Sequence, residues 1–199
     1  MSKGGRPLTV HPDLEKIRDY VEAGDQTKLQ SLLRTHGTDA YDDSRRTTLT
    51  WAAFFGNTPI LDWLIEAGGD LNHQDRIGYT GLHFAAQEKR PIVVSKLLSA
   101  GADPNLTDLH GNGPLWMALM NTKDDFAIVR ALVEAGAVSD KANKHGRSPD
   151  RLAMEMFGKP VGELFGAEER IQRFNKFSAT EENEVTEAPR SWLKRWFNR

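Results

Sequence analysis

Several features are missing from this 199-residue sequence. It has no cysteine, which excludes disulfides, thiolate metal sites and cysteine nucleophiles. Neither charge sign is in excess, since the formal net charge is −2, and a nucleic-acid-binding surface needs concentrated basic groups. No apolar run approaches the roughly eighteen residues of a membrane-spanning helix, and residues 1–10 lack the apolar stretch of a signal peptide. We therefore expect a cytoplasmic protein that binds no nucleic acid.

What is present is an internal repeat. One set of landmarks is the glycines Gly68, Gly101 and Gly136, and a second set is Leu49, Leu82, Leu115 and Asp150. Successive members of either set are 33 or 35 residues apart, and periods of this length are typical of solenoids. The two additional residues of the longer period fall in the polar stretch 121–125, which we expect to form a lengthened turn.

Each period follows one physical plan. A polar turn leads into a helix with small residues, such as Phe84-Ala85-Ala86, which lets neighbouring helices approach closely. A second helix carries paired aliphatic residues, such as Leu97-Leu98, and ends at a glycine suited to a left-handed cap. Because no single unit can bury its apolar face alone, the units must stack.

The third period resembles the ankyrin repeat. Residues 75–86, DRIGYTGLHFAA, followed by residues 97–105, LLSAGADPN, are close to the full pattern of that family. The resemblance covers about residues 13–165 and implies an all-α ankyrin repeat solenoid of about five helix–turn–helix units, with hairpin tips along one edge. The unit with Gly111 to Trp116 and the 121–125 insertion is similar to bacterial ankyrin proteins, some of which are immunity proteins that block a neighbouring toxin.

The resemblance also predicts how the chain is divided. The expected segments are an N-terminal arm (1–12), a stack (13–165) with units 13–42, 43–75, 76–108, 109–143 and 144–165, a short amphipathic helix (166–177), an acidic linker (178–189) and a basic aromatic tail (190–199). The outer two units depart from the pattern, as capping units do. In the last one Asp150 stands at the usual leucine, and the second helix is short and contains glycine, so we expect that end to be poorly closed.

Four internal departures predict local distortion. Arg45 stands where the family has the hairpin glycine, and Lys89 stands where it has a glycine between the helices. Both turns must then be made differently or under strain. Thr50 and Trp116 replace the turn histidine, which is present as His83 and is expected to bond within its own turn.

No residue set supports catalysis. The sequence has no Gly-x-Ser-x-Gly elbow, no His-Glu-x-x-His and no phosphate-binding loop. His73, His110 and His145 fall near neighbouring tips, where exposed or turn-stabilising roles fit better than a weak metal site. We therefore predict that the protein is not an enzyme and holds neither metal nor cofactor.

Binding to another protein is the function that this resemblance implies. The partner-contacting positions would line one concave surface, with Asp43, Ser44, Arg46, Arg76, Ile77, Tyr79, Leu109, His110 and Asn112 at the tips and Phe54, Phe55, Gln87, Glu88, Met120 and Asn121 at helix ends. Large apolar groups at exposed positions need a reason, which favours an interface. The alternative for Phe54 and Phe55 is packing against the first unit. Trp51 is expected in the core.

The last ten residues are basic and aromatic. In a helix, Trp192, Leu193, Trp196 and Phe197 would share one face, opposite Lys194, Arg195 and Arg199. Burying the four apolar side chains stabilises by about 6–12 kcal/mol at most, and ordering ten residues costs about 10–20 kcal/mol. A membrane anchor is therefore disfavoured. Docking on the last unit is favoured, with a protein partner or a membrane as alternatives.

These observations lead to one leading hypothesis. The chain is expected to be a non-enzymatic protein-binding module, and the resemblance suggests an immunity protein that binds and blocks a cognate toxin. A peripheral membrane adaptor, with the tail on lipid and the stack on cargo, is the alternative. A purely structural or oligomer-forming stack is the third interpretation.

Overall fold

The computed structural model describes residues 11–123 and 125–164. Its regular elements are η1 (Pro12–Lys16), α1 (Ile17–Glu22), α2 (Gln26–His36), α3 (Thr48–Phe55), α4 (Thr58–Glu66), α5 (Gly81–Gln87), α6 (Pro91–Ser99), α7 (Pro114–Asn121), α8 (Ala127–Glu134), α9 (Pro149–Phe157) and η2 (Val161–Glu163). Within these residues β-structure is limited to an isolated antiparallel bridge between Tyr41 and Thr47. The predicted all-α class is confirmed.

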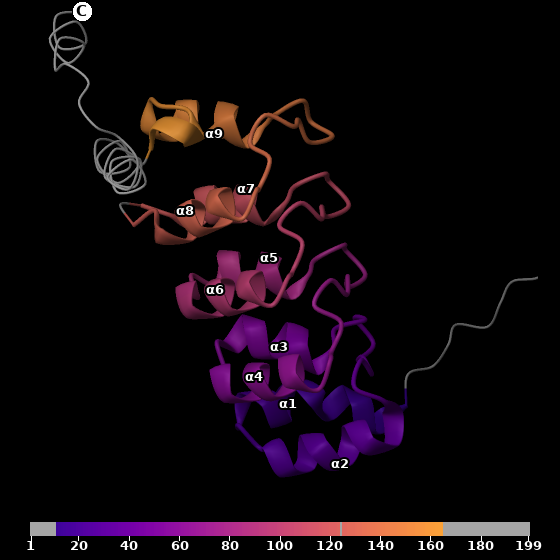
Figure 1. Cartoon of the computed structure of the whole chain (residues 1–199). Helices are drawn as coiled ribbons and strands as arrows, with labels where there is room; N and C mark the ends of the chain where they lie inside the picture. Colours follow the sequence, from indigo (N-terminus) through magenta and orange to yellow (C-terminus); the bar gives the residue numbers. More distant parts are fainter. Residues whose placement is uncertain (1–10, 124, 165–199) are drawn as a thin grey trace, which may run out of the picture. The chain divides into compact units, whose positions relative to one another are not determined.

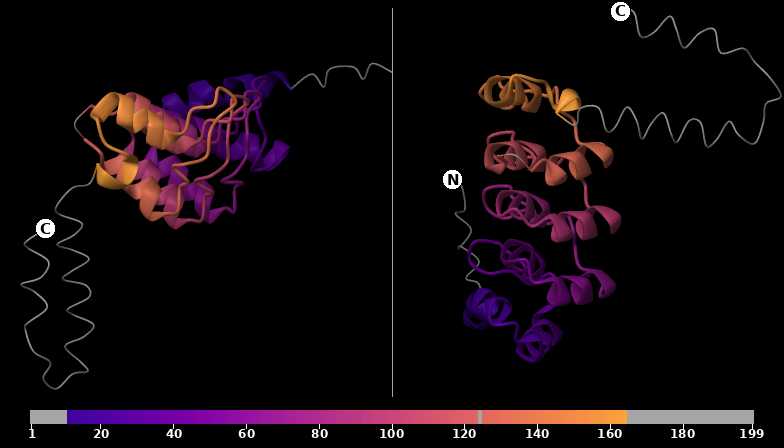
Figure 2. Two further views of the ribbon diagram at one scale, coloured as in Figure 1. Left: turned by 90° about the horizontal axis from the view of Figure 1, so that it is seen from above. Right: turned by 90° about the vertical axis from the view of Figure 1, so that its left-hand side faces the viewer.

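The helices of residues 11–161 form two layers (Figures 1 and 2). In one layer α1, α3, α5, α7 and α9 each pack against the next, and in the other α4, α6 and α8 do the same. The segments that join one unit to the next project from one edge as a column of loops (Figure 1). The second, third and fourth units therefore each contribute one helix to each layer, and the fifth contributes α9 to the first layer.

Small residues bring the inner helices together, as the sequence predicts. Ala52, Ala53, Ala85 and Ala86 on α3 and α5 are at most 1% exposed. The second layer is anchored by fully buried aliphatic residues such as Leu97 on α6. Burying one such side chain is worth roughly 1.5–3 kcal/mol, so a stack with several per unit has a continuous core.

The predicted strain at two turns is confirmed. Arg45 has φ of 61° and Lys89 has φ of 55°, both in the left-handed region. At the position equivalent to Arg45, the third and fourth units carry Gly78 and Gly111, with φ of 87° and 82°. Only glycine adopts this conformation without steric cost, so the two side chains are held there by their surroundings.

In the last described unit, Asp150 stands where the preceding units have a leucine, and its side chain is hydrogen-bonded on both sides. One carboxylate oxygen of Asp150 accepts a hydrogen bond from the backbone N–H of Val161 at 2.9 Å, and the other accepts from the Ser139 hydroxyl at 3.0 Å. Asp150 thus ties α9 to the segments before and after it. On the same helix Met154 and Met156 are 50% and 43% exposed.

The predicted helix at 166–177, the acidic linker and the basic aromatic tail lie outside the described residues, as does most of the N-terminal arm. The tail docking predicted for Trp192, Leu193, Trp196 and Phe197 therefore stays a prediction. None of the described helices has the length and apolar character to cross a membrane.

Candidate functional site

Four buried acceptors shape the projecting loops. Asp42, Asp75, Asp108 and Asn143 each accept hydrogen bonds from the backbone N–H groups two and four residues further on. These bonds are 2.8 to 3.1 Å long. We call the four turns that they close the tips and number each by its unit: the second tip is residues 43–46, the third 76–79, the fourth 109–112 and the fifth 144–147. Each acceptor takes two backbone N–H donors, and in the three tips closed by an aspartate the acceptor is also charged, which strengthens the bonds.

Neighbouring tips are joined to each other. The backbone N–H groups of Arg76, Leu109 and Lys144 donate to the carbonyl oxygens of Ser44, Ile77 and His110, at 3.1, 2.9 and 2.8 Å respectively. Each bond crosses from one unit to the preceding one. The tips therefore form one continuous surface, and most of the predicted contact residues lie on it.

Beside the tips, the inner helices carry a cluster that we call the aromatic band: Trp51, Phe54 and Phe55 on α3, Phe84 on α5, and Tyr79 at the third tip. The Phe54 ring lies 5.1 Å from Phe55 and 5.8 Å from Phe84. The Phe84 ring lies 5.1 Å from Tyr79. Edge-to-face contacts at such distances are favourable. Phe54 and Phe55 are both half-buried, and Phe54 contacts Phe84 of the unit after them.

Arg46 connects the aromatic band to the tips through contacts with both. Its guanidinium lies 4.9 Å from the Trp51 ring centre and 4.8 Å from that of Phe84. Its Nε donates to the buried carboxylate of Asp75 at 3.1 Å. The Trp51 indole N–H donates to Asp42 at 2.8 Å. The positive charge of Arg46 is thus paired with Asp75 and covered by the rings of Trp51 and Phe84. Trp51 is 6% exposed, as predicted for a core residue.

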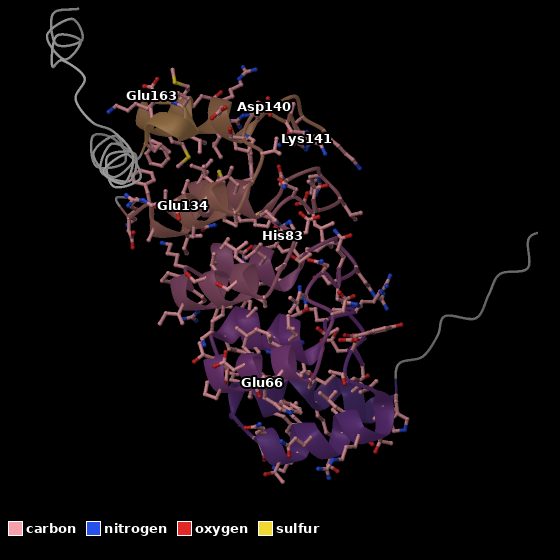
Figure 3. The ribbon with its side chains drawn as sticks, viewed as in Figure 1. Glu66, His83, Glu134, Asp140, Lys141 and Glu163 are labelled. Atoms are coloured by element: carbon pink, nitrogen blue, oxygen red, sulfur yellow. The ribbon has the colours of Figure 1, made fainter. Side chains whose placement is uncertain are left out.

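His83 supports the next tip from within (Figure 3). Its Nδ1 lies 2.8 Å from the Thr80 hydroxyl and 3.1 Å from the Thr80 N–H. Its Nε2 lies 3.2 Å from the carbonyl oxygen of Asn112 in the following unit. Burial lowers the pKa of His83 to about 4, against the opposing effects of this carbonyl and of nearby carboxylates. The predicted bond within its own turn is confirmed, and the side chain also links two units.

Tyr79 lies between His83 and solvent. Its ring stacks on His83 with centres 5.2 Å apart, and its hydroxyl donates to the Met117 sulfur at 3.5 Å. Burial, followed by the Asp108 and Asp75 carboxylates, raises the pKa of the Tyr79 hydroxyl. The hydroxyl therefore stays neutral at physiological pH.

Three of the predicted contact residues present large apolar side chains to solvent. Ile77 is 46% exposed, Leu109 is 58% exposed and Met120 is 51% exposed. The backbone bond between Ile77 and Leu109 places the first two on adjacent tips. Two rigidly held, adjacent apolar groups outside the core form a surface suited to a partner.

Other predicted contact residues are occupied within the molecule. Asn112 donates to Asp108 at 3.3 Å and accepts from Asn143 at 2.7 Å. Asn121 donates to the Met117 carbonyl at 2.8 Å. Gln87 donates to Glu88 at 2.9 Å. These side chains therefore make hydrogen bonds within the array.

A family model described as "Ankyrin repeats (3 copies)" matches residues 19–108. The stack is an array of ankyrin repeats. The residues that the family model matches include helices α3 and α5 and all five residues of the aromatic band.

Relatives from animals share the array. The chain is 33% identical over 122 residues to an E3 ubiquitin-protein ligase Ufd4 of Drosophila melanogaster, which covers 60% of this chain and 4% of that protein. It is 31% identical over 134 residues to the inactive serine/threonine-protein kinase TEX14 of Bos taurus, covering 67% and 9%. It is 30% identical over 161 residues to the ankyrin repeat and SOCS box protein 6 of Pongo abelii, covering 76% and 37%. The chain thus corresponds to a minor part of each relative.

Sequence reasoning missed the acceptors that close the tips of the ankyrin array. Asp42, Asp75 and Asp108 are 33 residues apart, and Asn143 follows after 35, the same spacings as the glycine landmarks. This signal was available in the sequence. Phe84 was read only as part of a small-residue helix, and its contact with Arg46 depends on how two units pack.

The three histidines in and beside the tips make different contacts. His110 and His145 stack with ring centres 5.9 Å apart. His73 bonds the Arg45 carbonyl through Nε2 at 2.9 Å and stacks on Tyr41. The stabilising role predicted for His73 therefore has a structural basis in the strained turn at Arg45.

Proposed function

We propose that this ankyrin array is a protein-binding module whose interface is formed by the tips and the adjoining aromatic band. Protein binding is general to ankyrin repeats, and the array adds a specific surface. The observation that carries the proposal is the pair of exposed apolar residues, Ile77 and Leu109, on two tips fixed by buried carboxylates. Rigid apolar anchors bind with little loss of conformational entropy.

The charge of the tips favours an acidic partner. They carry five basic side chains, namely Arg45, Arg46, Arg76, Lys144 and Arg147, and a single acid, Asp43. Arg46 and Arg147 pair with Asp75 and Glu155. Among the described residues, Arg45, Arg76 and Lys144 make no ion pair. A partner with carboxylates around an apolar centre would complement this surface and be attracted to it from a distance.

The array acts by binding rather than by catalysis in this proposal. Enzyme names occur among its relatives, but the matched segment is 4% of the ubiquitin ligase.

A finer form of the proposal is that the protein is a bacterial, cytoplasmic immunity protein. Its support is the resemblance of the Gly111–Trp116 unit and its insertion to such proteins. The tip surface would then cover the active site of a toxin, and its unpaired arginines would suit an acidic, cation-binding catalytic centre. An identified toxin encoded beside this chain, left fully active by a molar excess of it, would contradict this form.

The first experiment is affinity capture from lysate of the source cells, with the full chain as bait and mass spectrometry as readout. Ile77→Ala combined with Leu109→Ala is expected to lose the captured partner, because both side chains are exposed and their loss leaves the core intact. Ile92→Ala is the matched control, since Ile92 is 65% exposed but lies on α6 in the other layer.

A second variant tests the band itself. Phe54→Ala combined with Tyr79→Ala is expected to weaken binding, because it removes two rings that adjoin the exposed tips. Circular dichroism separates this loss from unfolding. Capture of the same partner at parental level by both double variants would remove the tips and the band from consideration.

The membrane-adaptor alternative depends on residues 190–199, which lie outside the described residues. Co-sedimentation with anionic liposomes, with and without these residues, tests it directly. Equal sedimentation of both chains would contradict it. The same deletion tests the predicted docking of the tail, which requires the melting temperature to fall.

A further inference from the structure

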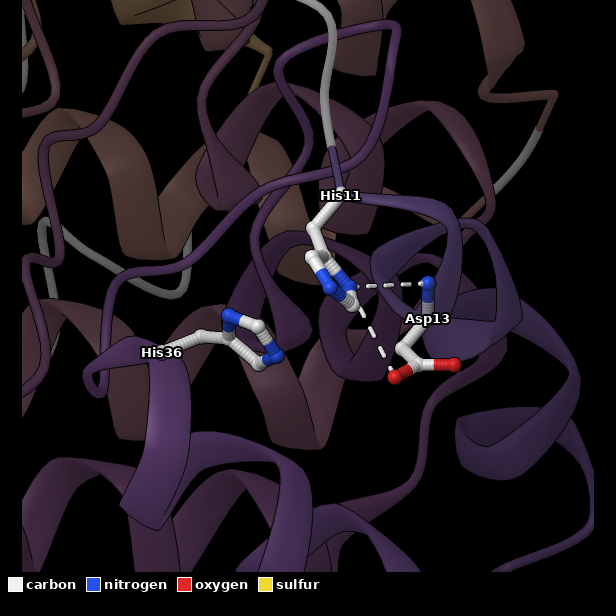
Figure 4. A group of neighbouring side chains, drawn as sticks. All are labelled: His11, Asp13 and His36. Atoms are coloured by element: carbon white, nitrogen blue, oxygen red, sulfur yellow. Dashed lines mark hydrogen bonds and ion pairs between the residues drawn. The ribbon is translucent and has the colours of Figure 1, made fainter.

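Two histidines and an aspartate converge at the outer end of the first unit. His11 immediately precedes η1, Asp13 lies in it, and His36 is the last residue of α2. One potential ligand atom from each side chain lies within 4.8 Å of the other two. Figure 4 shows the ring of His36 directed toward that of His11, with the Asp13 carboxylate on the far side of the His11 ring.

From these three side chains we infer a binding site for a divalent transition metal ion, with Zn²⁺ as the fitting ion. Two imidazoles with one carboxylate are a donor set for zinc and related ions, whereas Mg²⁺ and Ca²⁺ require oxygen ligands. Three protein ligands leave one tetrahedral position to water. This site departs from the sequence-based prediction that the protein holds no metal.

The geometry needs only small side-chain movements. Tetrahedral zinc with bonds of about 2.0–2.2 Å places its ligand atoms roughly 3.3 Å apart. The centres of the His11 and His36 rings are 4.7 Å apart, and His11 Nδ1 lies 3.5 Å from an Asp13 carboxylate oxygen. The side chains of His11 and Asp13 are 55% and 51% exposed, so both can rotate without disturbing the core.

The neighbouring groups leave the potential metal-ligand atoms of His11 and Asp13 accessible. Lys16 Nζ pairs with Oδ1 of Asp13 at 3.4 Å, while Oδ2 faces His11. The backbone N–H of Asp13 donates to His11 Nδ1 at a long 3.3 Å. Metal coordination would replace this weak contact with a stronger one.

The site would join the first and last elements of the first unit, η1 and α2. That unit begins with a 3₁₀ turn of five residues, and α1 has six residues. Such short elements are marginal on their own. A metal bridge from His11 to His36 would fasten the start of η1 to the end of α2. Since an ion bound only by the folded state stabilises it by mass action, the ion would strengthen this end of the array.

The test uses the tag-free full chain after treatment with a chelator. Titration with ZnCl₂ in a calorimeter is expected to show one ion per chain, and zinc is expected to raise the melting temperature. His11→Ala, His36→Ala and Asp13→Asn should each weaken binding by at least about tenfold, the lower end of the loss seen when even outer-shell partners are changed. MgCl₂ should give no such heat.

The matched control is His110→Ala combined with His145→Ala. These two histidines also stack, with ring centres 5.9 Å apart, but they belong to no three-residue group of candidate ligands within the described residues. The control variant is expected to bind zinc as the parent does. Absence of zinc binding by the parent, unchanged binding after His36→Ala, or loss of binding in the control would each overturn the proposal.

Discussion

The second and third tips solve the same geometric problem in different ways. The third tip has Gly78 at its left-handed position and His83 behind it, and both choices follow the family pattern. The second has Arg45 at the left-handed position and Thr50 in place of the histidine. Thr50 bonds only within its turn, to Thr47, whereas His83 also reaches the next unit.

The difference shows where strain is tolerated. Left-handed non-glycine residues cost of order 1–3 kcal/mol and persist where their surroundings hold them. The strained second tip is held by Asp42, by the His73 bond to the Arg45 carbonyl and by the packing of the Arg45 guanidinium on Tyr41. The strained turn presents the exposed Arg45 side chain, which makes no ion pair with the described residues, to solvent. The third tip reaches the same backbone geometry with glycine, without that strain.

The largest expected effect comes from removing the acceptor of the third tip. Asp75→Ala deprives two backbone N–H groups of their acceptor and leaves the largely buried Arg46 charge unpaired. We expect the free energy of unfolding to fall by about 3 kcal/mol, measured by urea denaturation. Asp42→Ala should cost less, because its carboxylate pairs with no arginine. Asp43→Ala, at an exposed acid, should change little, and an equal loss there would contradict this explanation.

Lowering the pH should weaken the third tip through His83. Its pKa falls from 6.5 to about 4 on folding, so between these values the unfolded chain binds a proton that the folded chain excludes. Stability should therefore decrease as pH falls from about 6.5 to 4, by about 3 kcal/mol in total. His83→Thr, which copies Thr50, should abolish this contribution. Denaturation curves at several pH values check it, and an identical pH dependence in both proteins would refute it.

Gly78→Ala should destabilise by about 2 kcal/mol or more. The new Cβ would lie 2.8 Å from the Asp108 Cα, in addition to the cost of a φ of +87°. Gly146→Ala is the matched control, because it has a φ of +73° but nothing within 4 Å of the new Cβ. Thermal melts should rank the control as the milder change. Equal losses would mean that contact between tips contributes nothing.

The smallest expected effect is a gain in stability. Arg45→Gly should stabilise the array by about 1 kcal/mol by relieving its left-handed strain, less the greater entropy of an unfolded glycine. Lys89→Gly should do the same at the turn between α5 and α6. Only Arg45→Gly should also weaken partner binding, since Arg45 lies on a tip and Lys89 does not. A loss of binding in both would contradict this assignment, because Lys89 lies outside the tips.

Most of the array was predictable because its signals are local and periodic. The helices, the strain at Arg45 and Lys89, and the turn bond of His83 all depend on residues close in sequence. The predicted surface was less certain, because exposure depends on neighbouring units. Ile77, Leu109 and Met120 are exposed, whereas Asn112 and Asn121 turn their side chains to internal hydrogen bonds.

The sequence by itself determined the repeat, the helical class and the positions of the tips, since a period of 33 residues with fixed glycines and small residues permits one way of stacking. Only the tertiary structure decided that Arg46 lies between Trp51 and Phe84, that His83 reaches the next unit, and that His11 meets His36. These contacts join residues up to 38 positions apart, and their geometry arises from the packing of one unit on another or of one helix on its partner.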